Sequence, residues 1–315
     1  MWDVLAITGP IFILVALGFV SARGGLVAAE QVRGMGTFVI TFALPSLVFK
    51  AVSERKLSEV LHPDFLIAYA AAALLTFAIG FVIAKKLRRE NLSTSSILAM
   101  GMSVSNSGFV GFPIAYMVVG QTAALGMALV MLVENLLMLP LALALAEAGR
   151  QSGSGMAVLR ETLLRLAKNP LIIAIVLGLL FSVLDWHLPS VPLKVVDMLA
   201  TASAPVALFV IGATLNSLKG QASIVDVLQT STGKLIIQPL LLFIAFGFTT
   251  GIDPLLMVAG MISAGAPMMT IFPILGQRYG LEARCAAALV INLVLAFFTI
   301  NALLMLLRWQ GWIAS

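Results

Sequence analysis

Charged side chains are scarce in this chain. Lys, Arg, Asp and Glu make up 10% of the 315 residues, whereas 61% of the residues are hydrophobic. An ordinary soluble protein has roughly 25% charged residues. The composition therefore excludes a soluble globular domain, and the mean hydropathy of +1.08 predicts a polytopic membrane protein.

Cysteine and the motifs of several chemistries are missing too. Cys285 is the single cysteine, which excludes an intrachain disulfide and a cysteine-cluster metal site. The sequence has no GxxxxGK[ST] loop for ATP, no aspartate-rich Mg²⁺ motif for prenyl chemistry and no intramembrane Ser/His pair for proteolysis. We therefore expect neither an enzyme nor an ATP-driven pump, and no cofactor.

Uncharged apolar runs predict the membrane spans. They cover roughly residues 4–22, 34–49, 65–84, 91–133, 169–184, 198–218, 235–252, 254–277 and 285–307. A spanning helix needs about 17–25 apolar residues. The run 91–133, which continues to Ala146 across one Glu, is too long for one span and divides at Gly120-Gln121-Thr122. The sequence therefore predicts an all-α protein with ten transmembrane helices.

The distribution of Lys and Arg predicts the orientation. If the loop with Lys85, Lys86, Arg88 and Arg89 is cytoplasmic, the loops on that side hold 14 Lys and Arg, and the opposite side holds five. By the positive-inside rule both termini then lie outside, and the net charge of +5 reflects orientation rather than nucleic-acid binding. This count places every Lys and Arg in a loop or at a span end, so we expect no fixed cation within a span.

The sequence contains a weak internal repeat. Three pairs of prolines are separated by 160 residues: Pro10 and Pro170, Pro45 and Pro205, Pro113 and Pro273. Leu132-Val133-Glu134-Asn135 also resembles Leu289-Val290-Ile291-Asn292, at an offset of 157. We predict two five-helix repeats, residues 1–148 and 168–315, joined by a short cytoplasmic linker at 149–167. Because five is odd, the second repeat is expected to be inverted, as in secondary transporters.

Two of the predicted spans are interrupted at their centres. Asn106 to Pro113 interrupts the fourth span, and Ser263 to Pro273 interrupts the ninth. A broken helix survives at membrane depth where it is enclosed by protein or lines a cavity, and free N–H groups at helix N-termini attract anions. The breaks therefore predict a binding site for a small anion. The candidate substrate-binding residues are Ser105, Asn106, Ser107, Gly108, Gly111, Pro113, Gly265, Pro267, Thr270, Pro273 and Gln238.

Glu134 is the one ionisable residue expected deep within a span. A charge at membrane depth is costly, so such residues usually face the bundle interior or a cavity. Glu134 could exchange a proton, or it could help to bind Na⁺ with amide and carbonyl oxygens. A purely structural Glu that hydrogen-bonds a broken helix is the alternative. Asn135 and Asn292 are the further coupling-ion candidates.

These residues resemble the auxin efflux carrier family, which includes plant PIN-type carriers and bacterial malate and malonate permeases. Asn106 to Pro113 is similar to the family's N-x-G-x-x-G-x-P motif, and further similarities lie at Ala43–Phe49, Ile211–Leu215, Lys234–Pro239 and Gln277–Gly280. The resemblance implies the crossed-helix fold of bile-acid sodium symporters and NhaA-type antiporters, with helices 4 and 9 crossing at Pro113 and Pro273. It also implies a homodimer, contact between Asn106 and a substrate carboxylate, and an elevator motion of helices 3–5 and 8–10 against helices 1, 2, 6 and 7.

We therefore expect a secondary active transporter of small carboxylates, such as malate, malonate or auxin-like acids, embedded among the lipids of a bacterial inner membrane. The short linker differs from the long loop of the plant carriers and argues against auxin. A proton or sodium antiporter of the same fold and a ligand sensor that does not transport are the alternatives. Amides and helix ends alone would hold the anion, because no cation is expected within a span.

Overall fold

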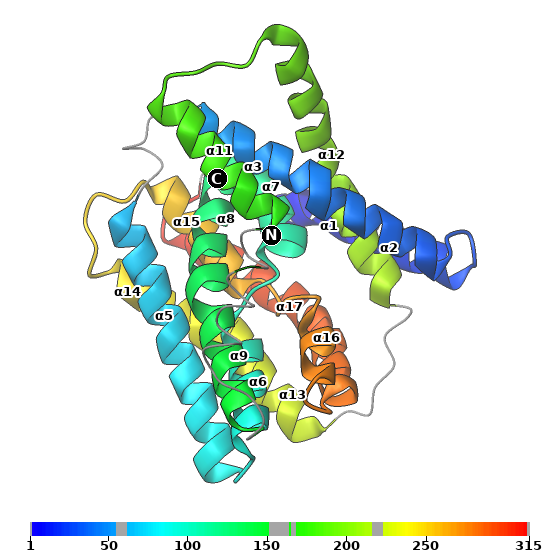
Figure 1. The fold of residues 1–315 in the computed structure, drawn as a ribbon, viewed down its shortest axis with the longest axis vertical. Coiled ribbons are helices and arrows are strands. Elements are labelled where there is room, and N and C mark those ends of the chain that lie inside the picture. Colours follow the sequence, from blue (N-terminus) through cyan, green and yellow to red (C-terminus); the bar gives the residue numbers. More distant parts are fainter. Residues whose placement is uncertain (1, 55–61, 151–163, 165–167, 216–222, 314–315) are drawn as a thin grey trace.

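The computed structural model of the chain describes residues 2–54, 62–150, 164, 168–215 and 223–313. Within these ranges the protein is helical and contains no strand, which confirms the all-α prediction (Figure 1). Six of the described helices are long and apolar enough to cross a membrane, and four apolar helices are shorter. The predicted linker 149–167 falls mostly outside the described residues.

A first group of helices comes from the beginning and the middle of the chain. It comprises α1 (Trp2–Arg23), α2 (Ala29–Phe38), η1 (Val39–Ala43), α3 (Leu44–Ser53), α11 (Pro170–Val183) and α12 (Ser190–Leu215), where η marks a π-helical segment. Within this group α1 packs along α12, and α3 packs against both α11 and α12.

The second group contains the remaining described helices. It comprises α5 (Pro63–Val82), η2 (Ile83–Leu87), α6 (Leu92–Ser103), η3 (Ser107–Gly111), α7 (Phe112–Val119), α8 (Thr122–Val133), η4 (Glu134–Met138), α9 (Leu139–Ala148), α13 (Ile224–Thr232), η5 (Gly233–Ile237), α14 (Gln238–Phe246), α15 (Pro254–Gly265), α16 (Phe272–Gln277) and α17 (Glu282–Trp309). Here α5 packs against α6 and α14, α15 packs against α8, and α17 packs against α13 and α16. The two groups meet where α3 contacts α8 and where α12 contacts η3 and α7.

The long apolar run divides where the sequence predicted. α7 ends at Val119, Gly120 has a φ of 61°, and α8 begins at Thr122. A positive φ of this size is strained for residues with a Cβ but not for glycine. Gly120 therefore ends one helix and lets the chain reverse into the next.

Four of the five described π-helical segments end two residues before a proline, namely Pro45, Pro113, Pro140 and Pro239. In each, the residue before the proline donates its backbone N–H to the carbonyl five residues earlier, as Leu139 does to Glu134. Proline has no N–H, and its ring clashes with the carbonyl four residues back. The wider turn accommodates the ring, so the prolines explain where these π-segments form.

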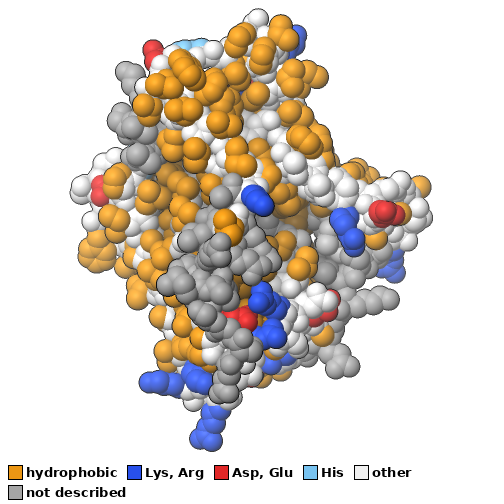
Figure 2. All heavy atoms as spheres, in the orientation of Figure 1, with side chains coloured by type: hydrophobic (Ala, Val, Ile, Leu, Met, Phe, Trp, Pro, Cys, Tyr) orange, Lys and Arg blue, Asp and Glu red, His pale blue; other side chains and the backbone are white. Residues whose placement is uncertain are grey.

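Hydrophobic side chains are spread over much of the face shown in Figure 2, and several Lys and Arg side chains lie towards its lower end, where the end of α5 lies in Figure 1. Lys85, Lys86 and Arg89 are exposed there. Large apolar side chains such as Phe248 and Trp309 are also exposed, at 87% and 84%. An apolar surface of this extent with a basic end is typical of a multi-pass membrane protein.

Two glycines allow α1 and α12 to pack with their backbones almost in contact. A Cβ on Gly212 would collide with the carbonyl oxygen of Val15, and a Cβ on Gly18 would collide with that of Phe209. Small residues at helix contacts in membranes allow this close approach. The contact between the first helix and α12 therefore depends on both glycines.

Gly212→Ala is expected to destabilise the protein, because the new methyl group must push α1 away from α12. Overpacking of this kind costs about 1–3 kcal/mol, and we expect a lower midpoint of thermal unfolding in detergent. Gly34→Ala in α2 is the matched control, because no atom lies within 4 Å of its added Cβ. Equal midpoints for the two variants would contradict the close contact.

Candidate functional site

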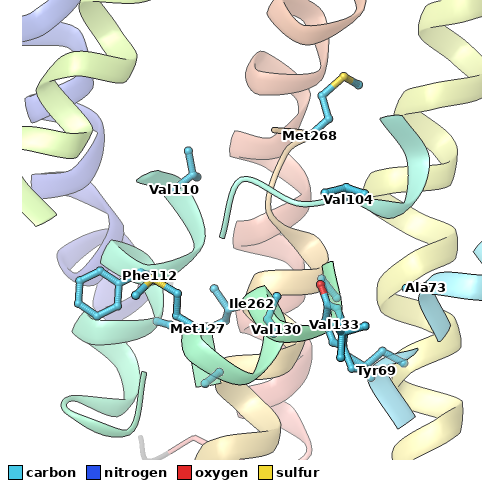
Figure 3. Packing of buried hydrophobic residues seen from close by; sticks show 14 of the residues in the cluster. Tyr69, Ala73, Val104, Val110, Phe112, Met127, Val130, Val133, Ile262 and Met268 are labelled. Atoms are coloured by element: carbon cyan, nitrogen blue, oxygen red, sulfur yellow. The ribbon is translucent and has the colours of Figure 1, made fainter. Parts of the chain in front are cut away.

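The two interrupted helices lie side by side at their breaks. The first break separates α6 from η3, and the second separates α15 from α16. Between them Ser105 and Met268 form an antiparallel bridge, and the Asn106 N–H donates to the Pro267 carbonyl at 2.7 Å. Figure 3 shows the extended segment of Val104 passing beside the segment of Met268. We call this region, residues 104–106 and 266–271, the crossover.

The first break covers residues 104–106, so it overlaps only the first residue of the Asn106–Pro113 octet. Val104 has extended backbone angles, Ser107 already begins η3, and Pro113 lies in the first turn of α7. The expectation that Pro113 interrupts the helix is therefore wrong, because the wider turn of η3 accommodates the proline within the continuous helix formed by η3 and α7. Pro273 lies in the first turn of α16, where a helix tolerates a proline because the N–H it lacks would have no partner. Both prolines lie after the break in their segment, Pro273 at the start of its half-helix and Pro113 about two turns into its own.

Each broken segment is held by a side-chain oxygen from a long helix that follows it. Glu134 Oε1 accepts a hydrogen bond from the Ser105 N–H at 2.8 Å, and Asn292 Oδ1 accepts one from the Met268 N–H at 2.9 Å. A buried backbone N–H without a partner would be costly. Glu134 and Asn292 therefore have equivalent structural roles at the two breaks.

Glu134 has a second donor that the sequence did not indicate. The Tyr69 hydroxyl in α5 donates to Glu134 Oε1 at 2.8 Å and lies 3.2 Å from the Ser105 hydroxyl. The Glu134 side chain is buried, with 3% of the residue exposed. The Asn135 amide donates instead to the Met131 carbonyl of the same helix. No local pattern around Tyr69 distinguishes it from the other aromatic residues of the chain.

Asn106 connects the two breaks. Its Oδ1 accepts from the Phe109 N–H at 3.3 Å and caps η3, while its Nδ2 donates to the Thr270 hydroxyl at 2.7 Å. The Phe109 N–H is one of the helix-terminal donors that no carbonyl of the same helix can satisfy. One buried amide thus fixes the start of η3 and ties it to the second broken segment.

A hollow of about 190 Å³ opens beside the crossover. Its polar lining consists of Ser105, Asn106, Ser107, Glu134, Asn135 and Thr270, and the beginnings of η3 and α16 both face it. Leu44 of α3 and Asn169 at the start of α11 close it from the first helix group. A water occupies about 30 Å³ in the liquid, so this crossover hollow is large enough for a small carboxylate.

Of the remaining candidate residues, Gly108 lines the crossover hollow and the others lie around it. Gly111 packs against α15, where an added Cβ would be in ordinary van der Waals contact with Ser263 Cα at 3.4 Å. A Cβ added to Gly265 would lie 2.8 Å from the Leu303 side chain. Gln238 donates to the Ser103 carbonyl at 3.1 Å, where α6 ends. Together with Gly108, which lines the hollow beside Leu44, these residues position the broken segments.

Lys234 is a buried cation at the crossover, and the expectation that no Lys or Arg lies within a span is wrong. Its residue exposure is 0%, and its ammonium donates to the Ala264 carbonyl and to Gln238 Oε1, each at 2.6 Å. The helix that contains it begins at Ile224, well before the uncharged run at 235–252. The spacing of Asp226, Thr230, Lys234 and Gln238 by four residues was the available signal, because it places polar groups on one helix face.

Glu134 was expected to be the one ionisable residue deep within a span, but a second acidic residue, Asp226, is also buried in a helix. Asp226 in α13 is fully buried and accepts from Arg88 Nη2 at 2.6 Å and from Arg284 Nε at 2.5 Å. Arg284 also pairs with Glu90 at 2.7 Å. We call these four residues the basic-end cluster, which joins α13, α17 and the segment after η2.

Glu147, at the end of α9, is buried as well, and it pairs with Arg278 at 3.4 Å. The Tyr279 hydroxyl donates to the same carboxylate. Burial, followed by the nearby Glu147 charge, raises the pKa of Tyr279. Tyr279 therefore stays protonated near neutral pH and remains a donor to Glu147.

A second hollow, of about 340 Å³, lies between α3 and α12 on one side and α7 and α8 on the other. Its charged lining residues are Lys50, Glu54 and Asp197, and Lys50 pairs with Asp197 at 2.5 Å. Phe112 lines this second hollow, whereas Phe109 lines the crossover hollow. One turn of the η3–α7 helix therefore separates the two hollows.

No group of three or more His, Cys, Asp or Glu in the part of the chain that the structure describes could hold a metal ion. The crossover offers hydrogen-bond donors and one cation instead. Amide, hydroxyl and helix-terminal N–H groups with a nearby ammonium are the chemistry that binds carboxylates.

Residues 5–304 match the family model described as "Membrane transport protein". The chain is 29% identical to the "Putative malonate transporter" of Rhizobium meliloti (strain 1021), over 98% of this chain and 97% of that protein. It is 24% identical to the "Uncharacterized transporter YfdV" of Escherichia coli (strain K12), over 91% and 92%. It is also 28% identical to "Auxin efflux carrier component 8" of Arabidopsis thaliana, over 51% of this chain and 46% of that protein.

Proposed function

The chain belongs to the membrane transport protein family that includes auxin efflux carriers, and on this premise we propose that it is a secondary active transporter of small organic carboxylates. The crossover hollow is the observation that carries the proposal. Two helix beginnings and the polar groups of Asn106, Ser107 and Thr270 face it. The similarity to a protein named as a malonate transporter favours small dicarboxylates such as malonate.

We propose that the two helix groups are the two parts of an elevator. The group of α1–α3, α11 and α12 would be the scaffold and, by the family resemblance, the site of homodimer contact. The other group would be the transport domain. Each group would combine helices from both repeats, residues 1–148 and 168–315, which would have opposite orientations in the membrane. The equivalent roles of Glu134 and Asn292 at the two breaks support this arrangement. We place the protein in the inner membrane. The distribution of Lys and Arg favours an orientation with both termini on the outer side.

The two hollows suggest how substrate would reach the crossover from either side. The crossover hollow extends towards the beginning of α11, and the second hollow lies beyond Phe112. If the transport domain slides along α3 and α12, the crossover would open to one hollow before the movement and to the other hollow after it. A cation antiporter of the same fold is less favoured, because the ammonium of Lys234 lies at the crossover and disfavours a second cation there.

The test is uptake of labelled malonate and malate into liposomes that contain the purified protein, with imposed pH or Na⁺ gradients. We expect saturable uptake that unlabelled dicarboxylates inhibit and that protein-free liposomes lack. Specific binding without uptake or exchange would identify a ligand sensor instead. Failure of every small carboxylate to bind or to be taken up would refute the proposal.

Thr270→Val is expected to lower malonate uptake about threefold to tenfold. The substitution keeps the side-chain shape but removes the hydroxyl that accepts from Asn106, and one such hydrogen bond contributes about 0.5–1.5 kcal/mol. Thr299→Val in α17 is the matched control, because that hydroxyl bonds to carbonyls of its own helix. Similar uptake by the two variants would argue against the Asn106–Thr270 contact as part of the site.

A further inference from the structure

One buried amine, Lys234, and one buried carboxyl group, Glu134, lie beside the crossover. Lys234 holds the Ala264 carbonyl at the end of α15, whereas Glu134 holds the Ser105 N–H in the other broken segment. The two groups interact electrostatically. With Glu134 ionised, their charges cancel.

Few other titratable groups face Glu134 in the described structure. Tyr69 of α5 donates to it, and Lys234 of η5 interacts with it electrostatically. α8 contains no titratable residue, and Glu147 of α9 is occupied with Arg278 and Tyr279. The positive charges nearest to α13 belong to the basic-end cluster, where Arg88 and Arg284 are paired with Asp226 and Glu90. The charge of the crossover therefore depends on Lys234, Glu134 and whatever binds in the crossover hollow.

A carboxylate in the crossover hollow would make the region negative if Glu134 stayed ionised. One uncompensated charge at membrane depth lowers the population of a state on the order of 100-fold. A proton on Glu134 removes this excess, because Lys234 then compensates the substrate. Na⁺ is a poorer counter-ion, since it would lie beside a fixed ammonium and since Glu134 Oε1 and Asn292 Oδ1 already accept backbone N–H groups.

We propose that the protein moves each singly charged carboxylate together with one proton held by Glu134, with Lys234 as the counter-charge of the bound anion. A proton from water adds to the Glu134 carboxylate and forms the neutral acid, and the substrate carboxylate then binds in the crossover hollow. On the other side the anion leaves and the proton returns to water. A dicarboxylate would travel in its singly charged form. This inference rests on the proposed function and specifies its coupling ion.

The cycle passes through two neutral states. The empty carrier has Lys234 charged and Glu134 ionised, and the loaded carrier has Lys234 charged, Glu134 protonated and one anion bound. Transport is then electroneutral. Proton-coupled uptake should follow an imposed pH gradient but not an imposed membrane potential.

Two neutral substitutions separate the two charges. In Glu134→Gln the loaded state stays neutral while the empty carrier becomes positive, so exchange of internal for external malonate continues and net uptake falls about 100-fold. In Lys234→Gln, which keeps a donor for Ala264, the loaded state becomes negative, so malonate affinity falls about 100-fold. Glu282→Gln and Lys86→Gln are the controls, because both side chains are exposed.

The experiment uses liposomes with the full-length protein, labelled malonate, a pH-sensitive dye, and K⁺ with valinomycin to set the potential. We expect uptake that is driven by an inward proton gradient, unchanged by potentials of either sign, and accompanied by proton uptake, together with the opposite defects of the two variants. Three results would overturn this inference alone: carboxylate uptake that needs Na⁺, uptake that follows the membrane potential, and uptake that is still driven by the proton gradient in Glu134→Gln. Absence of any carboxylate binding or uptake by the wild type would overturn the proposed function as well. Thermal unfolding in detergent identifies a variant that fails because it is misfolded, and the wild-type potential dependence still decides the question.

Discussion

Asn106→Ala is expected to reduce carboxylate uptake at least 100-fold while the protein still folds. The substitution removes the cap of η3, the hydrogen bond to Thr270 and the amide that faces the crossover hollow. Loss of a helix cap costs about 0.5–2 kcal/mol, and a neutral hydrogen bond contributes about 1 kcal/mol. A chain of this size with a large apolar core tolerates these losses, but a misplaced broken segment would not hold the substrate.

Two further variants distinguish the binding role from the capping role. Asn91→Ala is the matched control, because Asn91 caps α6 by accepting from the Thr94 N–H at 2.8 Å, away from the crossover. It should keep near-normal uptake. Asn106→Asp retains an acceptor for the cap but loses the amide donor and adds a negative charge, so it should lose uptake despite intact folding. Equal uptake by Asn106→Ala and Asn91→Ala would refute the site.

Asp226→Ala is expected to have the largest effect on stability. The substitution leaves Arg88 and Arg284 of the basic-end cluster without the carboxylate that accepts three hydrogen bonds from them. Removing one partner of a buried ion pair typically costs about 3–5 kcal/mol. The value here should lie near the lower limit, because the Arg88 and Arg284 side chains are 16% and 30% exposed. We expect a loss of about 3 kcal/mol, measured by denaturant unfolding in detergent.

The control for this loss is Asp64→Asn. Asp64 is exposed in the first turn of α5, where a negative charge contributes roughly 0.3–1 kcal/mol through the helix dipole. Asp226→Asn should fall between Asp226→Ala and the wild type, because the amide oxygen still accepts from one arginine. If Asp226→Ala were as stable as Asp64→Asn, the basic-end cluster would contribute nothing to stability.

Local rules explain the parts of the fold that the sequence predicted. The uncharged runs located most of the helices, and Gly120 marked the division between α7 and α8 because it alone tolerates the required φ. The two breaks were recognisable because proline, glycine and small polar residues interrupt otherwise apolar runs. Their side-by-side placement followed from the repeat, which pairs Pro113 with Pro273.

Contacts between distant segments explain what the sequence did not predict. The match at an offset of 157 pairs Asn135 with Asn292, whereas the hydrogen bonds to Ser105 and Met268 pair Glu134 with Asn292. Tyr69 joins the site from a separate helix and has no distinguishing neighbours in sequence. Uncharged runs place Lys234 outside a span, because every charged residue ends such a run, and the run at 235–252 begins just after it. The four-residue spacing from Asp226 to Gln238 indicates one continuous helix instead.

The π-helical segments have a consequence for sequence comparison. Each five-residue π-turn contains one residue more than the α-turn it replaces, so it is equivalent to a one-residue insertion in a straight helix. Deleting Leu136 from η4, or Ile236 from η5, would convert the π-turn into an α-turn and leave the flanking helical segments in their relative orientation, because each kind of turn completes about one revolution. Glu134 begins η4, and Lys234 is the second residue of η5. Relatives that lack one residue here keep the same helix faces when the gap lies inside the turn, so alignments should place their gaps there rather than in the loops.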